Sequence, residues 1–210
     1  MSARDEILNK LRSRSRQPDT HPPAWRSRRH FDDLAERFAE SLGKSKGEVI
    51  RAGSLDEAFE QLDQTLLALG ARCVVANDEP PLSQIDLAAR WPGMQWHIVG
   101  RTPGDLRGFC ATADAGVSSV VAALAETGSV VVTSGPGKSR LATLLPPVHI
   151  ALVPESCLTA DLYTFTAARQ GPPPAMQTLI SGPSKTADIE QTMAVGVHGP
   201  KRFIVILYRD

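Results

Sequence analysis

The tripeptide Ser-Gly-Pro occurs twice, at residues 134–136 and 181–183, and each copy follows a short apolar run that is typical of a strand. Glycine and proline end a strand and force a turn, and the N–H groups of such a turn can bind an anion. Hydroxyl and cationic side chains, which bind carboxylates and phosphates, lie in or beside these loops. The candidate ligand-binding residues are therefore Ser134, Gly135, Lys138, Arg140, Ser181, Gly182 and Ser184.

His198 is a further candidate, because it lies in a Gly- and Pro-containing turn shortly after the second loop. There it can contact a ligand or simply hold the turn together. If the strands before the two loops point the same way, both loops lie at one edge of a sheet, where α/β proteins bind ligands. The alternative is that the loops are two exposed turns whose charges face solvent.

Glu126 is the candidate catalytic residue, because it lies in a predicted bend, Ala125–Gly128, between two apolar runs. A carboxylate that loses water at such a bend has a raised pKa and can act as a general base or nucleophile. The alternative is a structural role in which Glu126 accepts hydrogen bonds from N–H groups of the turn. No His, Lys or second carboxylate is evident as its catalytic partner.

Two nucleotide-binding motifs and a metal site are excluded. Gly137, Lys138 and Ser139 resemble the end of a P-loop, but Val132 stands where the motif requires its first glycine. The dinucleotide pattern fails because Arg140 replaces its last glycine. The cysteines are widely separated and form no pair with metal-ligand spacing, so no zinc or iron–sulfur site is predicted in this chain; they are Cys73, Cys110 and Cys157.

The elements that must position these residues alternate between strand and helix. The best-defined helix is Ser54–Leu69, where Ser54 and Glu57 form a capping box and Gly70 is the stop. The remaining predicted helices cover residues 31–42, 82–89, 163–170 and 186 or 188 to 195, with Asp188 and Gln191 as a possible second capping box. The predicted strands cover residues 48–52, 72–76, 95–99, 120–124, 129–133, 176–180 and 203–208. A helix over 117–125 competes with the hairpin 120–133.

This alternation predicts a single α/β domain with a largely parallel sheet, over residues 31–210. Residues 1–30 form a basic N-terminal arm with eight Lys and Arg against three acidic residues, a net charge of +5. With 23 residues of each sign in the whole chain, residues 31–210 carry 15 against 20, or −5. A short helix over residues 2–12 and an extended linker are predicted in the arm, which docks on the domain, contacts a partner or stays flexible. No aromatic and basic surface pattern indicates nucleic acid.

A hydrophobic content of 42% and a charged content of 22% are those of a soluble globular protein. No apolar run approaches the roughly 20 residues that a membrane span requires, and the first residues have no apolar signal core. The predicted location is the cytoplasm.

Four segments resemble the LUD-domain family, in particular its lactate utilization members: ISGPSKTADIE at 180–190, GVHGPKR at 196–202, AETGSVVV at 125–132 and LATLLPPVHIALVP at 141–154. The resemblance implies the NagB/RpiA/CoA transferase-like fold, shared with sugar-phosphate isomerases and CoA transferases. It also implies a subunit with no cofactor of its own, which acts with iron–sulfur partner proteins in the oxidation of L-lactate to pyruvate. The alternatives are a stand-alone transferase or isomerase acting on a phosphorylated or CoA-linked metabolite, and a non-catalytic scaffold. A small anionic metabolite is the expected ligand.

Overall fold

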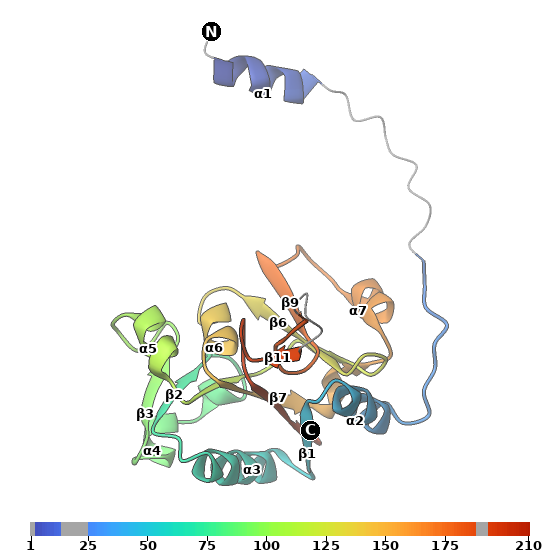
Figure 1. The fold of residues 1–210 in the computed structure, drawn as a ribbon. Helices are drawn as coiled ribbons and strands as arrows, with labels where there is room; N and C mark the ends of the chain where they lie inside the picture. The colour runs from blue at the N-terminus through green and yellow to red at the C-terminus, as the bar shows by residue number, and fades with distance from the viewer. Residues whose placement is uncertain (1–2, 14–24, 188–192) are drawn as a thin grey trace.

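Six parallel strands form the central sheet of the computed structural model, which describes residues 3–13, 25–187 and 193–210 (Figure 1). Their spatial order is β1 (Glu48–Ala52), β12 (Arg202–Tyr208), β7 (Val148–Pro154), β4 (Ala115–Ser118), β2 (Cys73–Ala76) and β3 (Gln95–Ile98). The central strands β12 and β7 are buried along almost their whole length, as expected of strands covered on both faces. The predicted α/β class with a largely parallel sheet is confirmed.

Helix α3 (Leu55–Ala68) covers one face of this sheet, where it contacts β12 and β1, and its apolar stripe joins a core cluster that includes residues of β2 and β7. Ser54 Oγ accepts a hydrogen bond from the Glu57 N–H at 3.2 Å, and the Glu57 carboxylate accepts one from the Gly53 N–H at 2.6 Å. These local bonds fix where the helix starts, as predicted. The predicted helix 82–89 is two short pieces, a 3₁₀ turn at Leu82–Gln84 and α4 (Leu87–Arg90).

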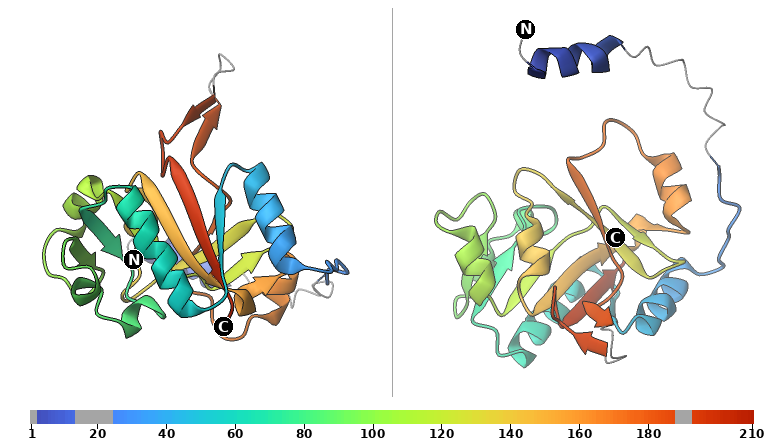
Figure 2. Two further views of the ribbon diagram at one scale, coloured as in Figure 1. Left: turned by 90° about the horizontal axis from the view of Figure 1, so that it is seen from below. Right: turned by 45° about the horizontal axis from the view of Figure 1, so that its top comes forward.

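A second sheet and α2 (Leu34–Lys44) cover the opposite face. This sheet has the order β8 (Leu158–Thr159), β5 (Ala122–Leu124), β6 (Ser129–Ser134) and β9 (Met176–Ile180). In the left view of Figure 2, α3 and α2 lie on opposite sides of the central strands. Strands β5 and β6 are antiparallel neighbours, so the predicted hairpin is confirmed over the competing helix.

Three short helices complete the domain: α5 (Leu106–Thr112), α6 (Arg140–Leu144) and α7 (Leu162–Ala168). Each begins after a residue whose side chain accepts a backbone N–H of the first turn, namely Asp105, Ser139 and Asp161.

The N-terminal arm has a helix, α1 (Ala3–Ser13), close to the predicted bounds, and it buries none of its side chains. The described end of the arm contacts the domain, where the Trp25 ring meets Tyr163 of α7 edge-on, with centroids 4.6 Å apart. No helix in the described part of the chain is both long and apolar enough to cross a membrane.

The predicted helix between residues 186 and 195 is wrong at both of its described ends. Lys185–Ala187 (β10) and Met193–Val195 (β11) are antiparallel strands, with Thr186 opposite Ala194. The Gly196 N–H donates to the Ser184 carbonyl at 2.8 Å, so the two ends of the segment lie side by side. A helix of ten residues would separate them by about 15 Å. The proposed capping residues Asp188 and Gln191 lie outside the described residues.

Candidate functional site

The loop after β9 is held against the end of α2. The Ser184 N–H donates to the Pro200 carbonyl at 2.9 Å, and Lys185 Nζ donates to the Ser45 carbonyl at 2.6 Å. Gly182 has a φ of +119°, and a Cβ there would lie 2.8 Å from the Ser45 carbonyl oxygen. Only glycine fits this approach without strain, so the position of the loop is set by packing.

A pocket of about 170 Å³ lies between this loop, α6 and the turn before β12. It is lined by Thr143, Leu144, Thr178, Leu179, Ile180, Ser181, Gly182, Ser184, His198, Gly199, Pro200 and Phe203. Four of the candidate ligand-binding residues therefore meet here: Ser181, Gly182, Ser184 and His198.

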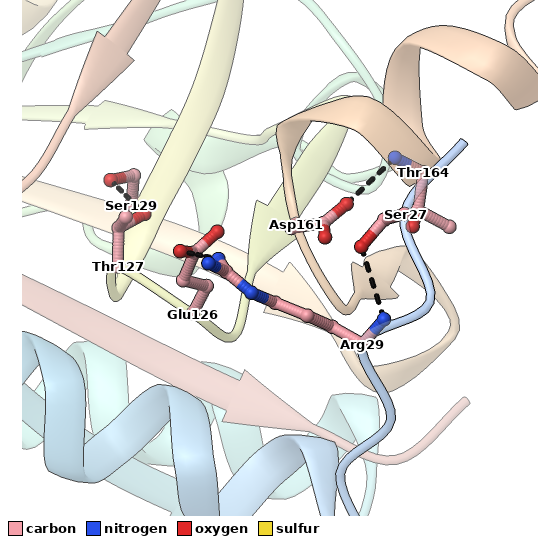
Figure 3. A network of polar contacts seen from close by, with 7 residues as sticks. All are labelled: Ser27, Arg29, Glu126, Thr127, Ser129, Asp161 and Thr164. Carbon is pink, nitrogen blue, oxygen red and sulfur yellow. Dashed lines mark hydrogen bonds and ion pairs between the residues drawn. The ribbon is translucent and has the colours of Figure 1, made fainter. Parts of the chain in front are cut away.

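A chain of hydroxyl groups connects the pocket with the bend at Glu126. Thr127 Oγ1 lies 2.7 Å from Ser129 Oγ, which lies 2.6 Å from Ser181 Oγ. Figure 3 shows the first of these contacts beside the bend. Ser129 is buried and Ser181 lines the pocket, so the chain runs from the bend into the site. The segments 125–132 and 180–187 are therefore in direct contact.

Glu126 forms an ion pair with Arg29 of the N-terminal arm (Figure 3). Both side chains are partly exposed, 30% for Glu126 and 51% for Arg29. Close by, Ser27 Oγ accepts the Arg29 N–H at 3.1 Å, and Asp161 accepts the Thr164 N–H at 2.7 Å. The Glu126 carboxylate is paired with the Arg29 guanidinium. A general base or nucleophile needs its carboxylate free to reach the substrate. A basic arm was visible in the sequence, but its docking on this bend was not.

The other Ser-Gly-Pro loop lies at the opposite end of the same strand pair. Strands β6 and β9 are antiparallel, with Ser134 opposite Met176 and Val130 opposite Ile180. Five residues of strand separate the two loops by about 17 Å. The condition for a shared site, parallel strands, is therefore not met, and the first loop does not reach the pocket.

The candidate residues of the first loop contact other parts of the domain. Ser134 is the last residue of β6. In the tight turn that follows, Gly135 and Lys138 exchange two backbone hydrogen bonds. Lys138 Nζ lies 3.5 Å from the Glu79 carboxylate and 3.4 Å from Thr133 Oγ1. Arg140 Nη1 lies 2.9 Å from Met176 Sδ.

Glu79 belongs to a polar cluster that the sequence analysis missed. Glu79 is buried and accepts the Ser119 N–H at 3.1 Å as well as contacting Lys138. Asn77 Oδ1 accepts the Ser139 N–H at 3.0 Å, and Asp78 is paired with Arg101 at 2.7 Å. The signal was present, because three polar residues in a row follow the buried strand β2. Their charges are satisfied within the cluster, which indicates a structural role.

His149 is a second buried group at the centre of the sheet. Its Nε2 lies 2.9 Å from Ser118 Oγ, and its ring stacks on Phe203 at 5.1 Å. Burial lowers the pKa of His149 to about 3, so the imidazole is neutral at physiological pH. Within the described residues, no group of three or more His, Cys, Asp or Glu side chains is arranged to hold a metal ion.

Comparison with known proteins adds evidence that the geometry cannot supply. The family model of the LUD domain matches residues 35–208. A protein of Halalkalibacterium halodurans named Lactate utilization protein C is 33% identical over 187 residues, covering 85% of this chain and 80% of the relative. A protein of the same name from an Exiguobacterium species is 30% identical over 227 residues, covering 85% and 96%.

Among solved structures, the crystal structure of a DUF162 family protein from Deinococcus radiodurans is similar to this chain. It has 20% sequence identity and a TM-score of 0.58, and the match covers 83% of this chain and 96% of that one. At this identity the likeness shows a common fold and nothing further.

Proposed function

This chain belongs to the LUD-domain family, and we propose that it acts in lactate utilization as the subunit without an iron–sulfur cluster, together with iron–sulfur partner proteins that oxidise L-lactate to pyruvate. The observation that carries this proposal is the similarity to relatives named Lactate utilization protein C over 85% of the chain. The match includes the segments that form the pocket and the Glu126 bend, because the LUD domain spans residues 35–208.

The cysteines of this chain support the assignment of the redox centres to partners. A typical iron–sulfur cluster is held by four cysteine thiolates, and the chain has three cysteines. Burial raises the pKa of the Cys110 thiol to about 11 and also raises the pKa of Cys157. In the metal-free chain both thiols are therefore protonated at physiological pH.

The test uses the host that encodes this chain. Deleting the gene should abolish growth on L-lactate but not on glucose, and the wild-type gene should restore it. An affinity-tagged chain purified anaerobically from lactate-grown cells should bring down proteins that contain iron–sulfur clusters, whereas the chain expressed alone should be colourless. Normal growth of the deletion strain on L-lactate would refute the proposal. Turnover by the isolated chain would instead favour the stand-alone enzyme.

A further inference from the structure

We infer that the pocket between β9, α6 and the turn before β12 binds a small 2-hydroxy or 2-oxo monocarboxylate, the chemical class of lactate and pyruvate. This inference rests on the proposed function for the choice among small acids. The pocket itself, its size and its chemistry are properties of the structure.

The size of the pocket fits such an acid. Its volume of about 170 Å³ is well above the roughly 10–15 Å³ that one water molecule needs, so a three-carbon acid can enter. Lactate and pyruvate have three carbons and three oxygens. A nucleotide or a CoA thioester is several times larger and would leave most of its atoms outside.

One part of the wall can bind a carboxylate. Three residues with hydroxyl groups, Thr178, Ser181 and Ser184, line the pocket together with His198. None of the described residues that line it is acidic. Hydroxyl groups donate to carboxylate oxygens, and such charge-assisted bonds are about twice as strong as neutral ones.

The hydroxyl chain prepares Ser181 for this role. When the Ser129 hydroxyl donates to Ser181 Oγ, at 2.6 Å, the proton of Ser181 is free to point at a ligand. Thr127 Oγ1, 2.7 Å from Ser129, can extend the same direction of donation from the bend to the pocket. A donor held in this way loses less freedom on binding than a freely rotating hydroxyl.

Apolar residues also line the pocket, and they suit the methyl group of these acids. Leu144, Leu179 and Phe203 line it. Phe203 is fully buried and stacks on His149, so its position is fixed, while Leu144 and Leu179 are partly exposed at the mouth. A mainly apolar lining with a few polar groups is the usual composition of a small-molecule site.

Isothermal titration calorimetry of the full chain tests the inference, with L-lactate and pyruvate as ligands and propionate, which lacks the 2-oxygen, as the comparison acid. L-lactate or pyruvate should bind more tightly than propionate. Ser181→Ala, Ser184→Ala and His198→Ala should each weaken binding about fivefold or more, the loss of one hydrogen bond. The matched control is Ser134→Ala, the same change in the other Ser-Gly-Pro loop, which should bind as the wild type does.

Thermal unfolding of each variant checks that it folds, and Thr178→Val is a second probe that keeps the shape of the wall. Absence of binding by the wild-type chain, or equal weakening in Ser134→Ala and the pocket variants, would overturn the inference. Either result would leave the growth defect of the deletion strain untouched. Normal growth of that strain despite specific binding would refute the proposed function alone.

Discussion

At the scale of single residues, the ionisable and polar side chains divide into those with a partner inside the domain and those that line the pocket. The first set is not fully satisfied, because the buried His149 Nδ1 has no hydrogen-bond partner among the described residues. His149, Glu79 and Glu126 all have partners inside the described structure: a serine hydroxyl, a lysine with a backbone N–H, and an arginine. Ser184 and His198 line the pocket and make no side-chain hydrogen bond to any residue that the structure describes. The second set is where binding is expected.

His149 should make stability depend on pH. Its pKa is about 3 in the folded chain and 6.5 in the unfolded one, so the unfolded state binds more protons between these values. The unfolding free energy should therefore fall as pH is lowered from 6.5 toward 3 and be independent of this group above 7. Denaturant unfolding at pH 7 and pH 5 measures it, and His149→Asn should lose less stability between the two. An equal loss in both proteins would contradict the assignment.

The Glu126–Arg29 pair should contribute little to stability, since both side chains are partly exposed. Arg29→Ala and Glu126→Gln should each lower the unfolding free energy by about 1 kcal/mol or less. The double variant should cost less than the two changes together, because one interaction is lost in each case. Chemical denaturation measures these effects. If Glu126→Gln abolished growth on L-lactate while folding and partner binding stayed intact, the catalytic role of Glu126 would be favoured instead.

At the scale of elements, local signals were sufficient for α3 and insufficient for the β10–β11 hairpin. Ser54 and Glu57 specify the start of α3 through bonds within four residues, which a sequence displays directly. The hairpin depends on bonds from Ser184 to Gly196 and Pro200, whose spatial relation no local pattern reveals. For the same reason the relative direction of β6 and β9, on which the shared-site hypothesis rested, could not be predicted. The turns that contain Ser181, Gly182, Ser184 and His198 could be predicted, because turn chemistry is local, whereas ligand binding by these residues stays a prediction.

The bend between β5 and β6 should tolerate no side chain at Gly128. Its φ is +64°, and a Cβ would lie 2.1 Å from the backbone nitrogen of Leu42 in α2. Gly128→Ala should therefore lower the unfolding free energy by about 2 kcal/mol or more, through strain and displacement of α2. Gly135→Ala is the control, since nothing lies within 4 Å of its Cβ position. Similar midpoints of denaturation for the two variants would show that the bend does not depend on this contact.

At the scale of the whole molecule, the described residues of the arm contact the domain mainly at its C-terminal end. Ile7 and Leu11 of α1 are 59% and 60% exposed, whereas Trp25 and Arg29 touch α7 and the β5–β6 bend. Deleting residues 1–30 should lower the melting temperature by a few degrees more than deleting residues 1–24, because only the longer deletion removes the contacts of Trp25 and Arg29 with the domain. Scanning calorimetry of the two truncations decides this. A large loss with the shorter deletion would show that α1 stabilises the fold.

The central claim is that the pocket between β9, α6 and the turn before β12 serves lactate utilization. The most direct measurement is the growth rate on L-lactate of strains that carry Ser184→Ala, His198→Ala or Ser134→Ala at the native locus, with protein levels checked by immunoblot. We predict that the first two grow more slowly than the wild type on L-lactate and normally on glucose, and that Ser134→Ala grows normally on both. Wild-type growth of both pocket variants on L-lactate, at equal protein levels, would contradict the account.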